Sequence, residues 1–219
     1  MTDPQCHPQP AGWKFIQGVL RFLFWLLLKL DVQGVEQLPE TGPAILCPNH
    51  VSWLDVALIA RYSKTAPVTL AAEKWEKAPV LNLLFRHFGQ AIFVNRGAPD
   101  KKALVAAMHA LRQGCVLGLA PEGTRSHDGI LRKGHDGAAW LASRTHALIV
   151  PIAIWGHEDV IRGHWLHLKR PHIHIRVGAP FTLPPESEKA RSREMEPYTE
   201  MIMRKIAAML PPERRGYYA

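Results

Sequence analysis

Short apolar runs, many of them rich in β-branched residues, alternate with helix-like segments along most of this chain. Runs of this kind are typical of strands that are buried on both faces of a sheet, and the segments between them carry apolar residues at helical spacing. The alternation predicts an α/β fold, a single domain with a largely parallel central sheet flanked by helices. The predicted strands cover 44–47, 68–71, 91–94, 116–119, 148–154 and 173–177, and the predicted helices cover 53–62, 79–88, 100–112 and 135–146.

The length of 219 residues fits one domain of ordinary size. Residues 1–12 are polar and contain proline, which is typical of a flexible tail, and residues 31–219 are expected to form the folded domain. Its last helix is expected to follow a surface connection at 180–197 and to end at Pro211-Pro212. The apolar stripe of that helix consists of Met195, Tyr198, Ile202, Ile206 and Met209.

Residues 13–30 are very apolar and are predicted to form an amphipathic helix. A helix of this length would reach about 27 Å, slightly short of the ~30 Å hydrocarbon core of a bilayer. An arginine at the bilayer centre costs roughly 2.5 to 3.5 kcal/mol, so Arg21 favours a helix that lies in the membrane interface. A helix packed on the domain is the alternative, and a cleaved signal peptide is disfavoured because Lys29 and Asp31 follow the apolar stretch. The polar arc contains Lys14, Gln17, Arg21 and Lys29, and the opposite side contains Ile16, Leu20, Leu23 and Leu27.

The formal net charge of +8 favours an anionic partner such as nucleic acid, a membrane surface or a phosphorylated substrate. No recognised nucleic-acid-binding motif accompanies the charge, so nucleic acid is not expected as a partner. The three cysteines, Cys6, Cys47 and Cys115, are odd in number and lack Cys-x-x-Cys spacing. We therefore expect neither a disulfide framework nor a cysteine zinc site, and Cys47 and Cys115 are expected to be buried thiols in a reducing compartment.

The run Asn49-His50-Val51-Ser52-Trp53-Leu54-Asp55 places a histidine and a carboxylate five positions apart, at a predicted helix start. A histidine is well matched to take a proton from an attacking alcohol near neutral pH, and a carboxylate on its other ring nitrogen would fix the tautomer. If Ser52 caps the helix, His50 lies in the preceding loop and can fold back toward Asp55. The pattern predicts a dyad, although taken alone it more often marks only a capping box.

Two further segments place arginines just past predicted strands. Pro121-Glu122-Gly123-Thr124-Arg125-Ser126 follows one strand, and Phe93-Val94-Asn95-Arg96-Gly97 overlaps and follows another. Ligands of open α/β sheets bind outside the carboxyl ends of the strands, and an arginine there offers a planar fork to a phosphate. The alternative is a surface ion pair between Glu122 and Arg125. Together the two segments predict a site for a dianionic phosphate.

With these segments in view, the chain resembles the glycerophospholipid acyltransferase family, which includes the 1-acyl-sn-glycerol-3-phosphate acyltransferases. The resemblance covers roughly residues 30–180 and rests on four blocks in the family's order. These blocks are Asn-His-x-Ser-x-x-Asp at 49–55, the arginine block at 92–97, Glu-Gly-Thr-Arg at 122–125, and Val150-Pro151-Ile152.

The resemblance implies transfer of a fatty acyl group from acyl-CoA or acyl carrier protein to the free hydroxyl of a lysophospholipid, typically 1-acyl-glycerol-3-phosphate, to give phosphatidate. It implies that residues 31–219 form an acyltransferase domain on the cytoplasmic face of a membrane, peripheral or monotopic, with a lipid surface as partner and no cofactor beyond the acyl thioester co-substrate. By position, His50 would be the general base and Asp55 its orienting partner. The substrate-binding residues would be Arg96, Glu122, Gly123, Thr124 and Arg125, and the acyl side would be shaped by Val150, Pro151 and Ile152.

Some residues depart from the family's pattern. Asn95 stands where many members have an acid, Leu131 replaces the usual phenylalanine of its loop, and a phosphate role for Lys74 is doubtful. The departures leave the dyad intact and leave the acceptor open among 1-acyl-glycerol-3-phosphate, glycerol 3-phosphate, a lyso-aminolipid and other lysophospholipids. The alternative from another class is a noncatalytic basic module that binds membranes.

The C-terminal half is rich in histidine, which raises the question of a metal site. The spacing of these residues completes no recognised ligand set, and the expected acyl transfer needs no metal, so none is predicted. The histidines concerned are His157, His164, His167, His172 and His174.

Overall fold

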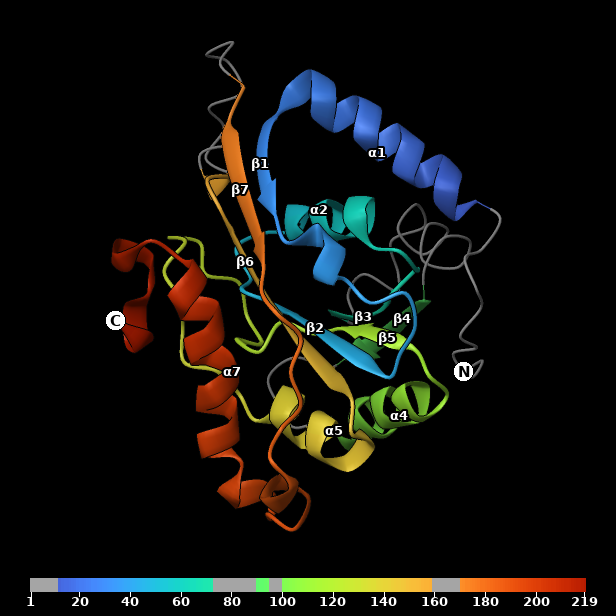
Figure 1. Ribbon diagram of the computed structural model, residues 1–219, viewed down its shortest axis with the longest axis vertical. Helices are drawn as coiled ribbons and strands as arrows, with labels where there is room; N and C mark the ends of the chain where they lie inside the picture. Colours follow the sequence, from blue (N-terminus) through green and yellow to red (C-terminus); the bar gives the residue numbers. More distant parts are fainter. Residues whose placement is uncertain (1–11, 73–89, 95–99, 159–169) are drawn as a thin grey trace.

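The computed structural model describes residues 12–72, 90–94, 100–158 and 170–219, and its centre is a seven-stranded sheet (Figure 1). The strand order is β1-β7-β6-β2-β5-β3-β4, and every neighbouring pair is parallel except β6 with β7. The predicted α/β fold with a largely parallel sheet is therefore confirmed. The strands are β1 (Lys29–Gln33), β2 (Ala44–Pro48), β3 (Val68–Ala72), β4 (Gln90–Val94), β5 (Val116–Gly118), β6 (Leu148–Trp155) and β7 (His172–Val177).

Helices cover both faces of the sheet (Figure 1). The helices α1 (Trp13–Leu27) and α2 (Leu54–Tyr62) lie on one face, where Phe24 and Leu58 pack with Ile152 of β6. The helices α4 (Lys101–Arg112), α5 (Gly137–Thr145) and α7 (Glu196–Met209) lie on the other face. The central strand β2 is buried along its whole length because both of its faces are covered. Short 3₁₀ helices are η1 (Val35–Gln37), η4 (Pro185–Glu188), η5 (Ser192–Glu194), η6 (Pro212–Arg214) and η7 (Gly216–Tyr218).

Local sequence signals explain where several helices begin and end. The carboxylate of Asp100 accepts a hydrogen bond from the backbone N–H of Ala103 at 3.0 Å, which caps the start of α4. Gly114 follows this helix with a φ of +83°, a conformation that favours glycine. The predicted helices at 53–62, 100–112 and 135–146 correspond to α2, α4 and α5. The helix predicted at 79–88 lies outside the described residues.

The prediction of one helix over 13–30 is wrong at its C-terminal end. Helix α1 stops at Leu27, and Lys29 belongs to β1, which pairs with β7. The alternation of polar and apolar residues from Lys29 to Gln33 suits an exposed edge strand, and β1 was not among the predicted strands. None of the described helices combines the length and the apolar character needed to cross a bilayer.

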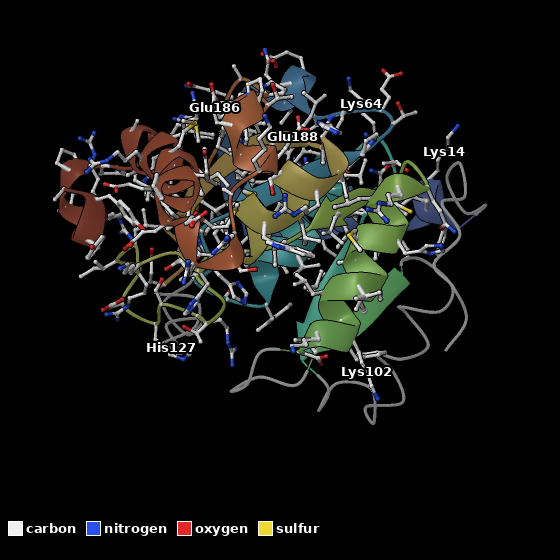
Figure 2. All side chains as sticks on the ribbon, turned by 90° about the horizontal axis from the view of Figure 1, so that it is seen from below. Lys14, Lys64, Lys102, His127, Glu186 and Glu188 are labelled. Carbon is white, nitrogen blue, oxygen red and sulfur yellow. The ribbon has the colours of Figure 1, made fainter. Side chains whose placement is uncertain are left out.

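Helix α1 has an inner face on the domain and an outer face in solvent. The side-chain amide of Gln17 donates to the backbone oxygen of Ser63 at 2.7 Å, just past the end of α2, and Leu20 packs against the core. Gln17 of the predicted polar arc and Leu20 of the predicted apolar side therefore both face the domain. Lys14 and Lys64 point outward (Figure 2). The most exposed apolar side chains of the helix are Phe15, Phe22, Trp25 and Leu26.

The cysteines differ partly from expectation. Cys47 is a fully buried free thiol, and burial raises its pKa far above the usual range. Cys115 is disulfide-bonded, so its assignment as an isolated thiol is wrong. The error arises because cysteine spacing along a chain does not report which side chains meet in space.

Candidate active site

The central strands β6, β2 and β5 are parallel neighbours, and their carboxyl ends lie at the same edge of the sheet. His50 follows β2, Glu122 follows β5 and His157 follows β6. The topology therefore brings three sequence-distant titratable side chains to the edge where α/β sheets bind ligands.

His50 and Asp55 form the predicted pair. Nδ1 of His50 lies 2.9 Å from Oδ2 of Asp55, and the same oxygen accepts the backbone N–H groups of Val51 and Ser52, each at 2.9 Å. The Oγ of Ser52 accepts from the backbone N–H of Leu54 at 3.0 Å. The helix start therefore serves two purposes, since Asp55 caps the backbone of the preceding turn while it holds the imidazole.

Asp55 is almost completely buried, with a side-chain exposure of 2%. Burial opposes its ionisation, but its contacts with His157 and His50 outweigh that effect and hold the pKa of Asp55 below its usual range. A carboxylate only accepts hydrogen bonds, so Nδ1 of His50 carries the hydrogen. In the neutral imidazole the lone pair is then on Nε2, and this atom makes no hydrogen bond among the described residues. The imidazole is oriented to take a proton from a ligand.

The segment at 121–126 holds the backbone of His50 from both sides. Oε1 of Glu122 accepts the N–H of His50 at 2.7 Å, and the N–H of Ser126 donates to the carbonyl oxygen of His50, also at 2.7 Å. The two segments that the sequence singled out are therefore physically joined. Because Arg125 adjoins Ser126, its backbone also lies close to His50.

Glu122 is buried and its second oxygen accepts the backbone N–H of Arg132 at 2.8 Å. Burial raises the pKa of Glu122 to about 7, and the nearby charge of Asp55 adds to that effect, although the hydrogen bonds from His50 and Arg132 oppose it. Both carboxylate oxygens are committed to backbone donors, so Glu122 braces the loops on either side. The surface ion pair with Arg125 that was considered from the sequence does not occur, because Glu122 points inward.

Gly123, Thr124 and Arg125 lie at the surface of this loop. Gly123 has a φ of +66°, and a Cβ there would lie 2.9 Å from the ring of His135, so the turn requires glycine. Thr124 is exposed, and Arg125 is half-buried with no hydrogen bond or ion pair among the described residues. The guanidinium is available to an anion. Arg96, the other predicted phosphate ligand, lies outside the described residues.

The segment Val150-Pro151-Ile152 lies in the middle of β6. Val150 and Ile152 are buried under α1 and α2, and the carbonyl oxygen of Ile152 accepts the N–H of Asn49 at 3.2 Å. These side chains build the core that supports the site. Their role on the acyl side stays a prediction.

A family model described as acyltransferase matches residues 29–155, more than half of the chain. This chain belongs to the acyltransferase family. The 1-acyl-sn-glycerol-3-phosphate acyltransferase of Borreliella burgdorferi is 31% identical over 148 residues, which cover 66% of this chain and 58% of that relative. A chloroplastic 1-acyl-sn-glycerol-3-phosphate acyltransferase of Arabidopsis thaliana is 29% identical over 136 residues, 61% of this chain and 38% of the relative.

The crystal structure of the 1-acyl-sn-glycerophosphate acyltransferase PlsC from Thermotoga maritima matches this chain with a TM-score of 0.69 and 26% identity, over 87% of this chain and 76% of that chain. The family resemblance predicted from the sequence is thus confirmed. The chain spans less than two thirds of the length of the two curated relatives.

Two buried side chains of the candidate site were not predicted to belong to it. Asn49 forms two hydrogen bonds with the backbone of Ile154, at 2.9 Å through Nδ2 and at 2.7 Å through Oδ1. His157 is fully buried, and its Nε2 lies 2.7 Å from Oδ1 of Asp55. The sequence signal was the position of each residue directly after, or close to, the end of a central strand.

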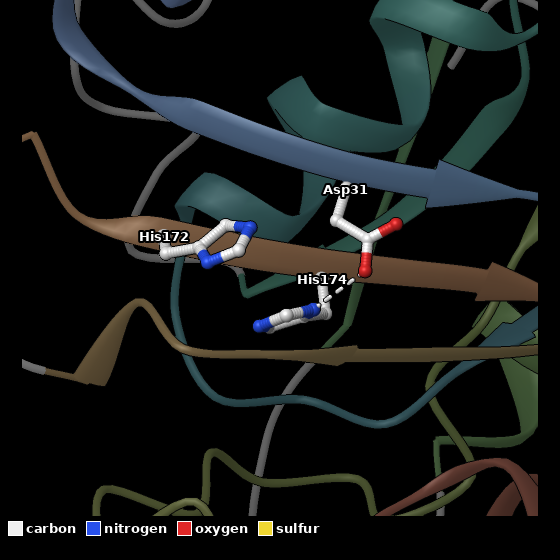
Figure 3. Close-up of side chains that lie close together, drawn as sticks. All are labelled: Asp31, His172 and His174. Carbon is white, nitrogen blue, oxygen red and sulfur yellow. Dashed lines mark hydrogen bonds and ion pairs between the residues drawn. The ribbon is translucent and has the colours of Figure 1, made fainter.

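Asp31, His172 and His174 form the metal-compatible cluster of the described residues, with ligand atoms within 4.8 Å of one another (Figure 3). The carboxylate of Asp31 is already paired with Nη2 of Arg176 at 2.5 Å and with Nδ1 of His174 at 2.9 Å. Hydrogen bonds from Arg176 and then His174 lower the pKa of Asp31 to about 2. The ring of His174 also stacks on Trp155. These partners account for the cluster, and we assign it no ion.

Proposed function

We propose that this protein transfers a fatty acyl group from an acyl thioester to the free hydroxyl of a lysophospholipid, and that the acceptor is 1-acyl-glycerol-3-phosphate, which becomes phosphatidate. The observation that carries the proposal is the 2.9 Å hydrogen bond between His50 and Asp55, which leaves Nε2 of His50 free in a member of the acyltransferase family. The printed names of the relatives support the choice of acceptor.

In the proposed reaction, Nε2 of His50 removes the proton of the acceptor hydroxyl while the hydroxyl oxygen attacks the thioester carbonyl. The tetrahedral intermediate collapses, the carbon–sulfur bond breaks, and His50 returns its proton to the departing thiolate. Asp55 stabilises the imidazolium between these two transfers without taking its proton. The products are the ester and the free thiol of coenzyme A or acyl carrier protein, so the chemistry needs no metal or other cofactor.

We propose that Arg125 binds the phosphate of the acceptor and that Arg96 assists it, as the family resemblance implies. The half-buried guanidinium of Arg125 has no ionic partner among the described residues, and its loop is hydrogen-bonded to His50. A phosphate held there would bring the neighbouring glycerol hydroxyl toward the imidazole. Glu122 and Gly123 would act by shaping this loop, and Thr124 is exposed beside the same position.

We also propose peripheral attachment to a membrane through the outer face of α1. Phe15, Phe22 and Trp25 are 72%, 59% and 67% exposed, which is unusual for three large apolar residues on one short helix. Lys14 and Arg21 lie on the same helix and would meet anionic headgroups. A lipid acceptor resides in the bilayer, so attachment would supply it directly. The side of the membrane follows only from the family resemblance.

The test is acyl transfer by the purified protein, with acyl-CoA and acyl carrier protein donors and a panel of lysolipids and glycerol 3-phosphate, read by mass spectrometry of the lipid products. Replacing His50 by alanine should abolish product formation, whereas replacing the exposed His127 of the neighbouring loop should leave it unchanged. A folded His50→Ala protein that acylates lysophosphatidate at the normal rate would refute the catalytic assignment. Product from a different acceptor alone would refute the substrate assignment and keep the reaction type.

A further inference from the structure

His157 is a buried histidine that the proposed reaction does not use. It has no exposed surface, and its Nε2 lies 2.7 Å from Oδ1 of Asp55. This close contact does not meet the geometric criteria of a hydrogen bond, and it is the only polar contact of Oδ1 among the described residues. Asp55 therefore lies between two imidazoles, with His50 on one oxygen and His157 on the other.

The fold places His157 under Asp55 by specific backbone features. Gly156 has a φ of +94°, and a Cβ at this position would collide with the carbonyl oxygen of His172, so only glycine allows the turn after β6. The N–H of Gly156 donates to Glu158 at 3.0 Å, and Glu158 also pairs with Arg214. These contacts fix the turn that carries His157.

A second set of contacts fixes the distance between the two histidines. The side chain of Asn49 forms two hydrogen bonds with the backbone of Ile154, which join the end of β2 to the end of β6. His50 directly follows Asn49, and His157 lies just beyond the end of β6. The two imidazoles are thus attached to neighbouring, cross-linked strands.

We propose that His157 is a positioning residue that fixes the carboxylate of Asp55 and, through it, the orientation of the His50 imidazole. Oδ2 of Asp55 already receives three donors, whereas Oδ1 would be a buried charged oxygen with no described partner if His157 were absent. Such an oxygen is costly to bury, so the carboxylate would rotate toward another donor or admit water. Either change would weaken the alignment of Nδ1 of His50.

The alternative is that His157 only fills space in the core. A filling role predicts lower stability, no special effect on the His50 hydrogen bond, and no dependence on Asp55. A positioning role predicts a fall in kcat with little change in KM, because the phosphate-binding loop is held by other contacts. Outer partners of an aligned catalytic group typically contribute about 10- to 100-fold to activity.

The experiment compares His157→Leu, which removes the polar contact with Oδ1, with His157→Gln, whose amide nitrogen can occupy the place of Nε2. Thr199→Val is the control, because Thr199 is another buried polar residue. It lies on α7, and its hydroxyl donates a hydrogen bond to Asp136 at 2.7 Å. We expect His157→Leu to lower kcat by about 10- to 100-fold at nearly constant KM, His157→Gln to recover most of it, and Thr199→Val to retain it. If the leucine variant does not fold, His157→Asn replaces it, since its shorter amide cannot reach Oδ1.

Two further readouts separate this proposal from the proposed function on which the kinetic test rests. The proton NMR signal of the His50 Nδ1–H, assigned by its loss in His50→Gln, should shift or broaden in His157→Leu and persist in His157→Gln, with no substrate present.

In an Asp55→Asn background, His157→Leu should lower kcat little further, because the two residues act as one unit. An unchanged signal and kcat in folded His157→Leu, or an equal loss of kcat in both backgrounds, would overturn the proposal. A wild-type protein without acyl transfer but with the expected NMR changes would refute the function alone.

Discussion

The buried carboxylate of Glu122 makes the stability of this protein depend on pH in a direction that can be worked out. Burial raises its pKa from 4.5 to about 7, so between these values the folded protein holds a proton that the unfolded chain has released. Folding is therefore favoured by this group at pH below 4.5, and the contribution declines as the pH rises toward 7. Asp55 does not interfere, because its pKa is lowered and its effect appears in acid.

The size of the effect follows from the two pKa values of Glu122. Each pH unit over which the folded state holds the extra proton corresponds to about 1.4 kcal/mol, so the whole change is about 3 kcal/mol. Replacement by glutamine removes the titration. The glutamine amide nitrogen would also face the backbone N–H of either His50 or Arg132, where a carboxylate oxygen accepted a hydrogen bond. The lost hydrogen bond lowers the free energy of unfolding by about 1 to 3 kcal/mol, independently of pH.

We therefore expect Glu122→Gln to be less stable than the wild type at pH 5, and the difference between the two proteins to shrink by about 2 to 3 kcal/mol by pH 8. Urea unfolding followed by circular dichroism at several pH values measures this difference. Glu213→Gln, at an exposed position, controls for the loss of a carboxylate from the surface. A stability difference between Glu122→Gln and the wild type that stays constant from pH 5 to pH 8 would refute the reasoning.

Three further predictions concern the site and its surface. Asp55→Asn should reduce kcat by about 10³- to 10⁴-fold in a steady-state acyl-transfer assay, because the amide holds the wrong His50 tautomer, and normal turnover would contradict the dyad. Gly123→Ala should lower the melting temperature and raise KM for the acceptor, because a φ of +66° disfavours a side chain and the new Cβ would lie 2.9 Å from the ring of His135. An unaltered melting curve and KM would exclude this strain. Phe22→Glu should weaken co-sedimentation of the protein with anionic vesicles, whereas Lys102→Glu, on the opposite face of the sheet, should weaken it less. Equal vesicle binding by the two variants would argue against membrane attachment through the outer face of α1.

The elements of the central sheet were predictable because their sequence patterns are local. A strand buried on both faces is a short apolar run, and Ala44–Pro48 and Leu148–Trp155 show this pattern clearly. The edge strand Lys29–Gln33 was missed because an apolar helix runs directly into it, and nothing in the preceding residues marks the change at Leu28. Periodicity identifies the middle of an element more reliably than its end.

The sequence by itself predicted the pair formed by His50 and Asp55, because the loop before a helix start can fold back and bring a histidine to a carboxylate five positions later. Only the tertiary structure decided that His157 reaches the other oxygen of Asp55, that Glu122 turns inward to brace His50, and which face of α1 is left exposed. These outcomes depend on the order of the strands and on packing between elements distant in the chain. Local patterns do not encode which strand ends will be neighbours, so long-range contacts appear only once the sheet is assembled.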